Sequence, residues 1–201
     1  MPTLVTRDRY FVSAMEIVTT EGFDNLRIGK LYASVGVTSG SFYHYFGSWK
    51  GFVDRLFEYW EAQQNDRLTT LATVSGDAVA RTGALTEFAL GVPHDTEAAI
   101  RAWSHTGSTV GVVQERVDRR REKAILSVVS AVVTAVVTDP ARARVLTMMG
   151  MMGMSIIGFQ QLRSPVEERE MCQMLDEYQR TVLAHSDDGC SPEPDRPRRQ
   201  T

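Results

Sequence analysis

The segment from Leu26 to Lys50 constrains the fold more than any other part of this chain. Apolar residues recur at helical spacing on both sides of one short turn, and this turn contains Gly36. Glycine readily adopts the left-handed backbone that ends many helices, and the hydroxyl of Thr38 is placed to cap the helix that follows. The segment therefore predicts two short helices joined by a tight turn.

The second of these helices is predicted to have one apolar side and one small, polar side. Phe42 and Phe46 stand four residues apart, so a rotation of about 100° per residue places both on the buried side. Tyr43 then lies on the flank. The residues predicted to face outward are Gly40, Ser41, His44 and Gly47. Such a face fits the major groove of DNA, because small residues permit close approach and longer ones reach phosphates or base edges.

A glycine turn, a capping hydroxyl and an aromatic cluster coincide in one register. The motif comprises Gly36-Val37-Thr38, Gly40, the aromatic run 42–46 and Ser48. This pattern resembles the DNA-binding domain of TetR/AcrR-family transcriptional regulators. Where that family usually has a lysine this chain has Trp49, and Lys50 is the candidate to take over the phosphate contact. A looser resemblance to the family's regulatory half covers residues 100–103 and 117–121.

Local signals place most of the helix ends. Gly22 is placed to end a first helix over about residues 7–21, and Ser48 to cap a fourth helix that runs to about residue 73. Residues 125–138 are rich in valine, but the run is too long for a typical strand and follows a helical tract without a turn, so a helix is predicted. Asp139 and Pro140 then restart the chain as cap and first helical residue. No strand, repeat or glycine-rich phosphate loop emerges, and the predicted fold is all-α.

Taken with the resemblance, these patterns predict three regions. Residues 1–47 are expected to form an N-terminal three-helix DNA-binding domain that contains the helix-turn-helix. A long helix then joins it to a C-terminal helical ligand-binding and dimerisation domain, residues 48–185. Residues 186–201 are rich in proline and charge, which predicts a disordered tail.

The expected partner of the N-terminal domain is double-stranded DNA. The net charge of the chain is −3, so basic side chains would have to gather locally to bind it. Phosphate contacts are expected from Arg27, Lys30, Tyr43, His44 and Lys50. The residues expected to face or flank the bases are Thr38, Ser39, Gly40 and Ser41. For His44, packing among the aromatic side chains is an equally good alternative.

The C-terminal half carries five methionines between residues 148 and 154. Methionine adapts its shape to varied apolar ligands, although methionines at helical spacing more often pack a core or an interface. The candidate effector-binding residues are Phe88, Trp103, Met148, Met151, Met152 and Phe159. The last two helices are apolar over a long stretch, which predicts a homodimer through a four-helix bundle. The resemblance implies a repressor that a small apolar or amphipathic effector releases from an inverted-repeat operator.

Other classes of function find little support in the residues. His94 and His105 lie eleven residues apart, not the three or four that place two metal ligands on one helix face, and no Gly-x-Ser-x-Gly nucleophile motif occurs. We therefore expect no catalytic residue, metal or cofactor, and no enzyme. Cys172 and Cys190 suggest a reducing compartment. The uncharged run 145–162 is broken by glycine and glutamine, so a buried helix and a cytoplasmic protein without a membrane span are predicted.

Two rival functions remain open from the sequence. One is a helical interaction protein that has lost DNA binding and uses Trp49 as a partner contact. The other is an enzyme whose site lies in the C-terminal half.

Overall fold

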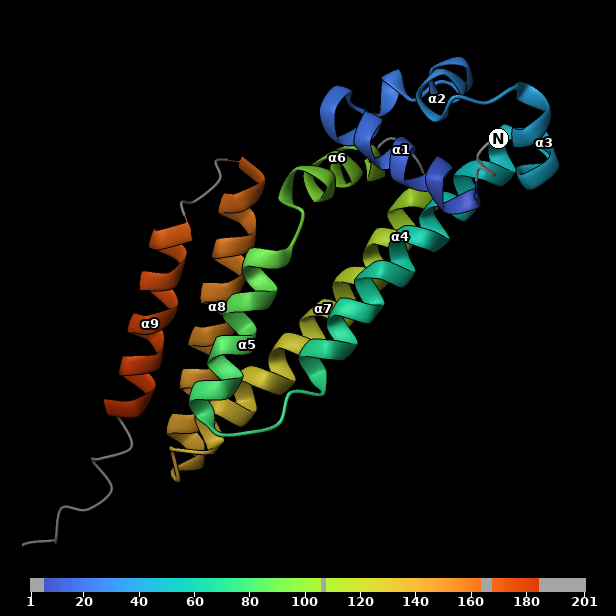
Figure 1. Ribbon diagram of the computed structural model, residues 1–201. Helices are drawn as coiled ribbons and strands as arrows, with labels where there is room; N and C mark the ends of the chain where they lie inside the picture. Colours follow the sequence, from blue (N-terminus) through green and yellow to red (C-terminus); the bar gives the residue numbers. More distant parts are fainter. Residues whose placement is uncertain (1–5, 106–107, 164–167, 185–201) are drawn as a thin grey trace, which may run out of the picture.

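The computed structural model describes residues 6–105, 108–163 and 168–184, and within these ranges the chain forms nine α-helices, one short 3-10 turn and no strand. Figure 1 shows short helices gathered at one end, the long helices α4 and α7 running side by side away from them, and α8 and α9 at the far end. The predicted all-α fold is confirmed. The tail predicted over residues 186–201 lies outside the described residues.

The short helices form the part that we call the head, residues 6–47. It contains α1 (Arg7–Glu21), the 3-10 turn η1 (Phe23–Asn25), α2 (Ile28–Val35) and α3 (Ser39–Phe46). The bounds of α1 agree with the prediction, and Gly22 follows it with a positive φ of 81°. Aromatic side chains fill the core of the head: the ring of Tyr10, fully buried, lies edge-on to Phe46 with their centroids 5.4 Å apart.

Helix α4 (Trp49–Ala72) leaves the head at a tight corner. The hydroxyl oxygen of Ser48 accepts a hydrogen bond of 3.0 Å from the backbone N–H of Gly51, so the predicted cap is confirmed. A Cβ atom on Gly51 would collide with the carbonyl oxygen of Phe46, the last residue of α3. Only glycine therefore allows α4 to start this close to the end of α3.

The remaining helices form the part that we call the body, together with α4. They are α5 (Ala78–Gly91), α6 (His94–Ser104), α7 (Ser108–Thr134), α8 (Pro140–Arg163) and α9 (Glu168–Ala184). The valine-rich segment is helical as predicted up to Thr134, because Val128, Val129, Val132 and Val133 are buried along α7. The cap at Asp139 is also confirmed, since its carboxylate accepts a hydrogen bond of 3.2 Å from the backbone N–H of Arg142.

Helix α6 packs against α1 of the head and against α7 of the body. The hydroxyls of Thr19 and Thr96 share a hydrogen bond of 2.7 Å between α1 and α6. The indole of Trp103 lies on the ring of Phe23 from the head. The head is thus held to the body at α6 as well as through the continuous chain at α4.

In the part of the chain that the structure describes, no helix combines the length and the hydropathy that a membrane span requires. Cys172 of α9 is a free thiol.

Candidate functional site

The turn between α2 and α3 has the predicted form. Gly36 is left-handed, with φ 74° and ψ 39°, and its N–H donates a hydrogen bond of 2.9 Å to the carbonyl of Tyr32. Thr38 occupies the N-cap position of α3 with an extended backbone, but its hydroxyl makes no capping hydrogen bond. The predicted bond is therefore wrong. The exposed Thr38 side chain contributes to the outer surface instead of closing the helix end.

Helix α3 buries the side that the sequence predicts. Phe42 is fully buried and Phe46 nearly so, while Ser39, Gly40, Tyr43, His44 and Gly47 are exposed. The outward prediction needs a correction at Ser41, which is half-buried. Its hydroxyl oxygen accepts a hydrogen bond of 3.0 Å from the phenol of Tyr10 in α1. Ser41 therefore lies at the edge of the face that α3 presents to solvent.

Tyr10 is a residue of this site that the sequence interpretation missed. It fixes one edge of α3 through Ser41 and packs against the rings of Phe42 and Phe46. Its position four residues before Ala14, which is also buried, is the helical spacing that could have placed it on the inner side of α1. The hydrogen bond to Ser41 joins residues 31 apart, and no local pattern predicts it.

The three basic residues predicted to hold phosphates differ in their surroundings. Arg27 precedes α2, is exposed, and forms no ion pair with any residue that the structure describes. Lys30 of α2 pairs with Glu21 at the end of α1. Lys50 in the first turn of α4 pairs with Asp54, with 2.7 Å between Nζ and the carboxylate oxygen. Both lysines thus form ion pairs with carboxylates.

Trp49 packs against the head core and does not project as a free contact. It is half-buried, and its ring lies 6.2 Å from that of Phe42 and 5.3 Å from that of Phe52. The rival function that used Trp49 as a partner contact gains no support from this placement.

The six residues predicted to bind an effector are not gathered in one place. Phe88 and Met151 pack, half-buried, against the same apolar cluster between α4, α5 and α7. Trp103 is buried in another cluster beneath the head. Met148 and Met152 lie on the outer side of α8, 57% and 63% exposed. Phe159 belongs to α8, but its side chain lies outside the described residues.

A groove of about 520 Å³ lies between α4 and α7 near the head. Its walls combine apolar and charged side chains: Asp54, Phe57, Glu58, Glu61, Thr109, Val112, Val113 and Arg116. None of the six predicted effector residues belongs to this set. Glu61 is held by Arg116 at 2.6 Å, and that hydrogen bond keeps the pKa of Glu61 below its ordinary value.

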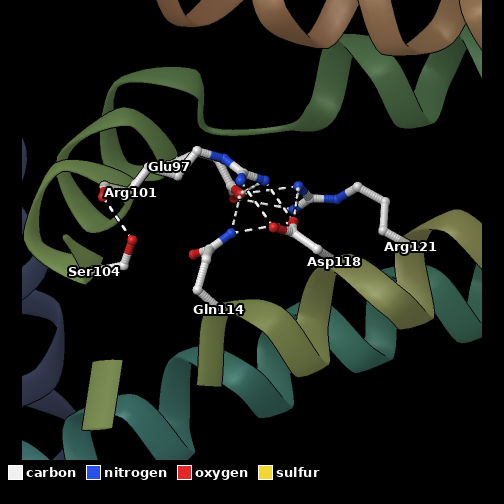
Figure 2. A network of polar contacts seen from close by, with 6 residues as sticks. All are labelled: Glu97, Arg101, Ser104, Gln114, Asp118 and Arg121. Atoms are coloured by element: carbon white, nitrogen blue, oxygen red, sulfur yellow. Dashed lines mark hydrogen bonds and ion pairs between the residues drawn. The ribbon is translucent and has the colours of Figure 1, made fainter. Parts of the chain in front are cut away.

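A partly buried polar network joins α6 to α7 (Figure 2). Arg121 donates to both carboxylate oxygens of Glu97, at 2.9 and 3.1 Å, and Arg101 donates to both oxygens of Asp118, at 2.8 and 2.5 Å. Gln114 donates to both carboxylates at 3.2 Å. Burial would raise the pKa of Glu97, but the hydrogen bond and charge of Arg121 and the charge of Arg101 outweigh burial and lower it. The network therefore holds α6 on α7 with charged groups.

Comparison with known proteins agrees with this geometry. Residues 11–56 match the family model described as bacterial regulatory proteins, tetR family. The amino-terminal domain belongs to the TetR family. Members of this family are DNA-binding transcription factors, in agreement with the expectation that the chain is not an enzyme. No curated protein sequence matches the chain.

Solved structures of TetR-family and other transcriptional regulators share the fold over most of this chain. A regulator from Saccharomonospora viridis, crystallised with choline, has a TM-score of 0.68 at 18% identity, and the match covers 86% of this chain and 94% of that one. A TetR-family regulator from Rhodococcus sp. has a TM-score of 0.64 at 13% identity, and the match covers 88% of this chain and 98% of that one. A TetR regulator from Haloarcula marismortui has a TM-score of 0.61 at 14% identity, and the match covers 90% of this chain and 96% of that one.

The TetR-family match contains every residue that we assign to DNA and none that we assign to an effector. It begins in α1 and ends inside α4, so the domain boundary predicted after residue 47 stays a prediction. The assignment as a DNA-binding regulator therefore rests on residues 11–56, which include most of the head and the first turns of α4.

Proposed function

We propose that the protein is a homodimeric, ligand-responsive transcriptional repressor that binds an inverted-repeat operator. The observation that carries this proposal is the orientation of α3, which buries Phe42 and Phe46 and exposes a small, polar face. A recognition helix with such a face enters the major groove without steric hindrance. Two copies at a fixed separation would read two half-sites.

The DNA contacts divide into two groups. We assign phosphates to Arg27, Lys30, Tyr43, His44 and Lys50, which lie on α3 or on the segments that flank it. We assign the base edges to the start of α3, at Thr38, Ser39 and Gly40, with Ser41 at the edge of that face. Phosphate contacts set affinity for all sequences alike, whereas contacts at the base edges set sequence preference.

An apolar face on α8 supports the homodimer. Val145, Met148, Met149 and Met152 follow the helical spacing of three, four and seven residues, and all are more than half exposed. Met174 and Leu183 of α9 are exposed as well. Water would contact this whole apolar face in a single chain, whereas a second copy related by twofold symmetry would cover it. Met148 and Met152 are thereby assigned to the interface.

The effector would enter the body and shift α4, which runs from the head to the cluster beside Phe88 and Met151. Phe88 and Met151 remain the proposed apolar contacts, together with Phe159 further along α8. Trp103 is not among them, because its indole packs against Phe23 and Phe57 beneath the head. A difference in effector affinity between two states worth about 1–3 kcal/mol changes operator occupancy by roughly 5- to 150-fold. A modest rearrangement thus suffices for release.

Gel-shift measurements on a duplex from the region upstream of its own gene, with a scrambled duplex of equal length, test the proposal. We expect the wild-type dimer to prefer its own upstream duplex. Arg27→Ala should weaken binding to both duplexes and reduce the slope of log K against log salt by about 1. The control is Val79→Ala, which changes an exposed side chain of α5 far from the predicted DNA contacts in the sequence. A folded dimer that shifts neither duplex at low salt would overturn the proposal.

A further inference from the structure

The two lysines in the head and the first turn of α4 form ion pairs with carboxylates. Lys30 and Lys50 are the only lysines in residues 1–56, and each forms an ion pair. The pair of Lys30 with Glu21 joins α2 to the end of α1, and the pair of Lys50 with Asp54 lies along the first turns of α4. The Lys50 side chain is 83% exposed, so its ammonium is free to leave Asp54 for another acceptor.

We propose that Glu21 and Asp54 limit the DNA affinity of the protein by competing with phosphate for Lys30 and Lys50. This inference rests on the proposed DNA-binding function. Each ammonium must leave its carboxylate before it binds a phosphate. The freed carboxylate then stays close to the negatively charged DNA backbone. Each of these lysine–phosphate contacts therefore adds less to the DNA affinity than a contact from a lysine without a carboxylate partner would add.

The competition has an appreciable effect on DNA affinity because the head and the first turns of α4 carry little net positive charge. Residues 1–56 contain six basic and five acidic side chains, so their excess of positive charge is small. Binding without sequence preference depends almost wholly on phosphate contacts. Glu21 and Asp54 thus suppress binding to arbitrary DNA more than binding to an operator, which also gains contacts from α3.

The salt dependence distinguishes this exchange from an ordinary charge effect. A lysine that binds phosphate releases about 0.9 of a counterion from duplex DNA. Where the lysine leaves a carboxylate, the freed carboxylate attracts a cation and offsets this release. Removing the carboxylate should therefore steepen the slope of log K against log salt by up to about one unit.

The experiment compares full-length variants by fluorescence anisotropy on the upstream and scrambled duplexes over a series of NaCl concentrations. The variants are Asp54→Asn and Glu21→Gln. The matched controls are Glu58→Gln, one turn further along α4, and Asp24→Asn in η1, because both are exposed and make the same change in net charge. Neither control residue forms an ion pair with any residue in the described ranges. Thermal melts verify that all variants fold.

We expect Asp54→Asn and Glu21→Gln to bind the scrambled duplex about two- to fivefold more tightly than their controls, with steeper salt slopes. Lys50→Met should then cost more affinity in the Asp54→Asn background than in the wild type, and Lys30→Met likewise with Glu21→Gln. Equal behaviour of variants and controls, or equal lysine costs in both backgrounds, overturns the inference while wild-type DNA binding still supports the proposed function. Loss of all binding, by wild type and variants alike, overturns both.

Discussion

The ring of Phe23 stacks on the indole of Trp103, with their centroids 3.4 Å apart and their planes inclined by 21°. Phe23 belongs to η1 of the head and Trp103 to α6 of the body. Phe57 of α4 packs against the same indole, with a centroid distance of 4.6 Å. The head, α4 and α6 therefore meet at Trp103, which explains why this residue is unavailable to the cluster around Phe88.

Replacing Phe23 by alanine should weaken the attachment of the head. The substitution removes the stack on Trp103 and leaves a gap at the half-buried position, at a cost of about 2 kcal/mol. Urea unfolding monitored by tryptophan fluorescence should show a lower midpoint and an early transition of the head. Phe23→Leu, which keeps part of the apolar contact, should lie between this variant and the wild type. An unchanged midpoint for Phe23→Ala would show that the stack contributes nothing.

Replacing Glu97 by glutamine should be one of the most costly single changes in the body. Glu97 is 3% exposed and accepts from Arg121, Arg101 and Gln114. Its loss leaves two guanidinium groups with one carboxylate, and breaking a buried ion pair in this way costs about 3–5 kcal/mol. Glu115→Gln breaks an exposed pair with Arg119 on α7 and should cost less than about 1 kcal/mol. Similar unfolding free energies for the two variants would contradict this account.

The same carboxylate should make stability depend on acid pH. The folded pKa of Glu97 lies below its ordinary value of 4.5, so the network stabilises the protein above that pH and the contribution is lost as the pH falls through the folded pKa. Urea midpoints measured from about pH 6 down to about pH 3 should fall more steeply in the wild type than in Glu97→Gln. Parallel curves for the two proteins would show that other groups cause the loss of stability in acid.

Two glycines of α8 should respond to alanine in opposite directions. A Cβ atom at Gly150 would lie 2.8 Å from Val129 and would collide with the hydroxyl of Tyr178, whose pKa burial raises to about 12. Gly150→Ala should therefore cost about 1–3 kcal/mol by overpacking. Gly153 has no atom within 4 Å of the same position, so Gly153→Ala should stabilise the helix by up to about 1 kcal/mol. Thermal melts of both variants check the contrast, and a shared sign would refute it.

Charged substitutions on the exposed apolar face of α8 should disrupt the dimer. Met148→Glu together with Met152→Glu places two carboxylates within the proposed interface, and sedimentation velocity should show monomers. Val79→Glu introduces a charge at an equally exposed apolar residue of α5 and should leave the dimer intact. Dimers that persist in the double variant would place the interface elsewhere.

Local chemistry in the sequence predicted the head well. The turn at Gly36, the cap at Ser48 and the burial of Phe42 depend on residues only a few positions away, so periodicity and capping rules suffice. The contacts that the sequence interpretation missed join distant positions. Tyr10 reaches Ser41 across 31 residues, and Glu97 reaches Arg121 across 24.

The positions of the residues that we predicted to bind an effector were harder to anticipate for a related reason. A methionine run on α8 shows that the helix is apolar, but the rotation of the helix about its axis decides which members face the core. Gly150 permits the close approach of Tyr178 and Val129 on one side, and that contact turns Met148 and Met152 outward. Packing between helices fixes this rotation, and no spacing rule within one helix contains it.

The corner at Gly51 couples the motion of two helices. Because the backbone of Gly51 lies against the last carbonyl of α3, the recognition helix has no room to pivot independently on α4. Helix α4 has 24 residues and is therefore about 36 Å long, so an inclination of only 10° at its distant end would carry α3 sideways by roughly 6 Å. A displacement of that size exceeds the rise of a single base pair. Because the contact at Gly51 makes α3 follow α4, a small tilt of α4 in the body would move α3 out of register with the major groove.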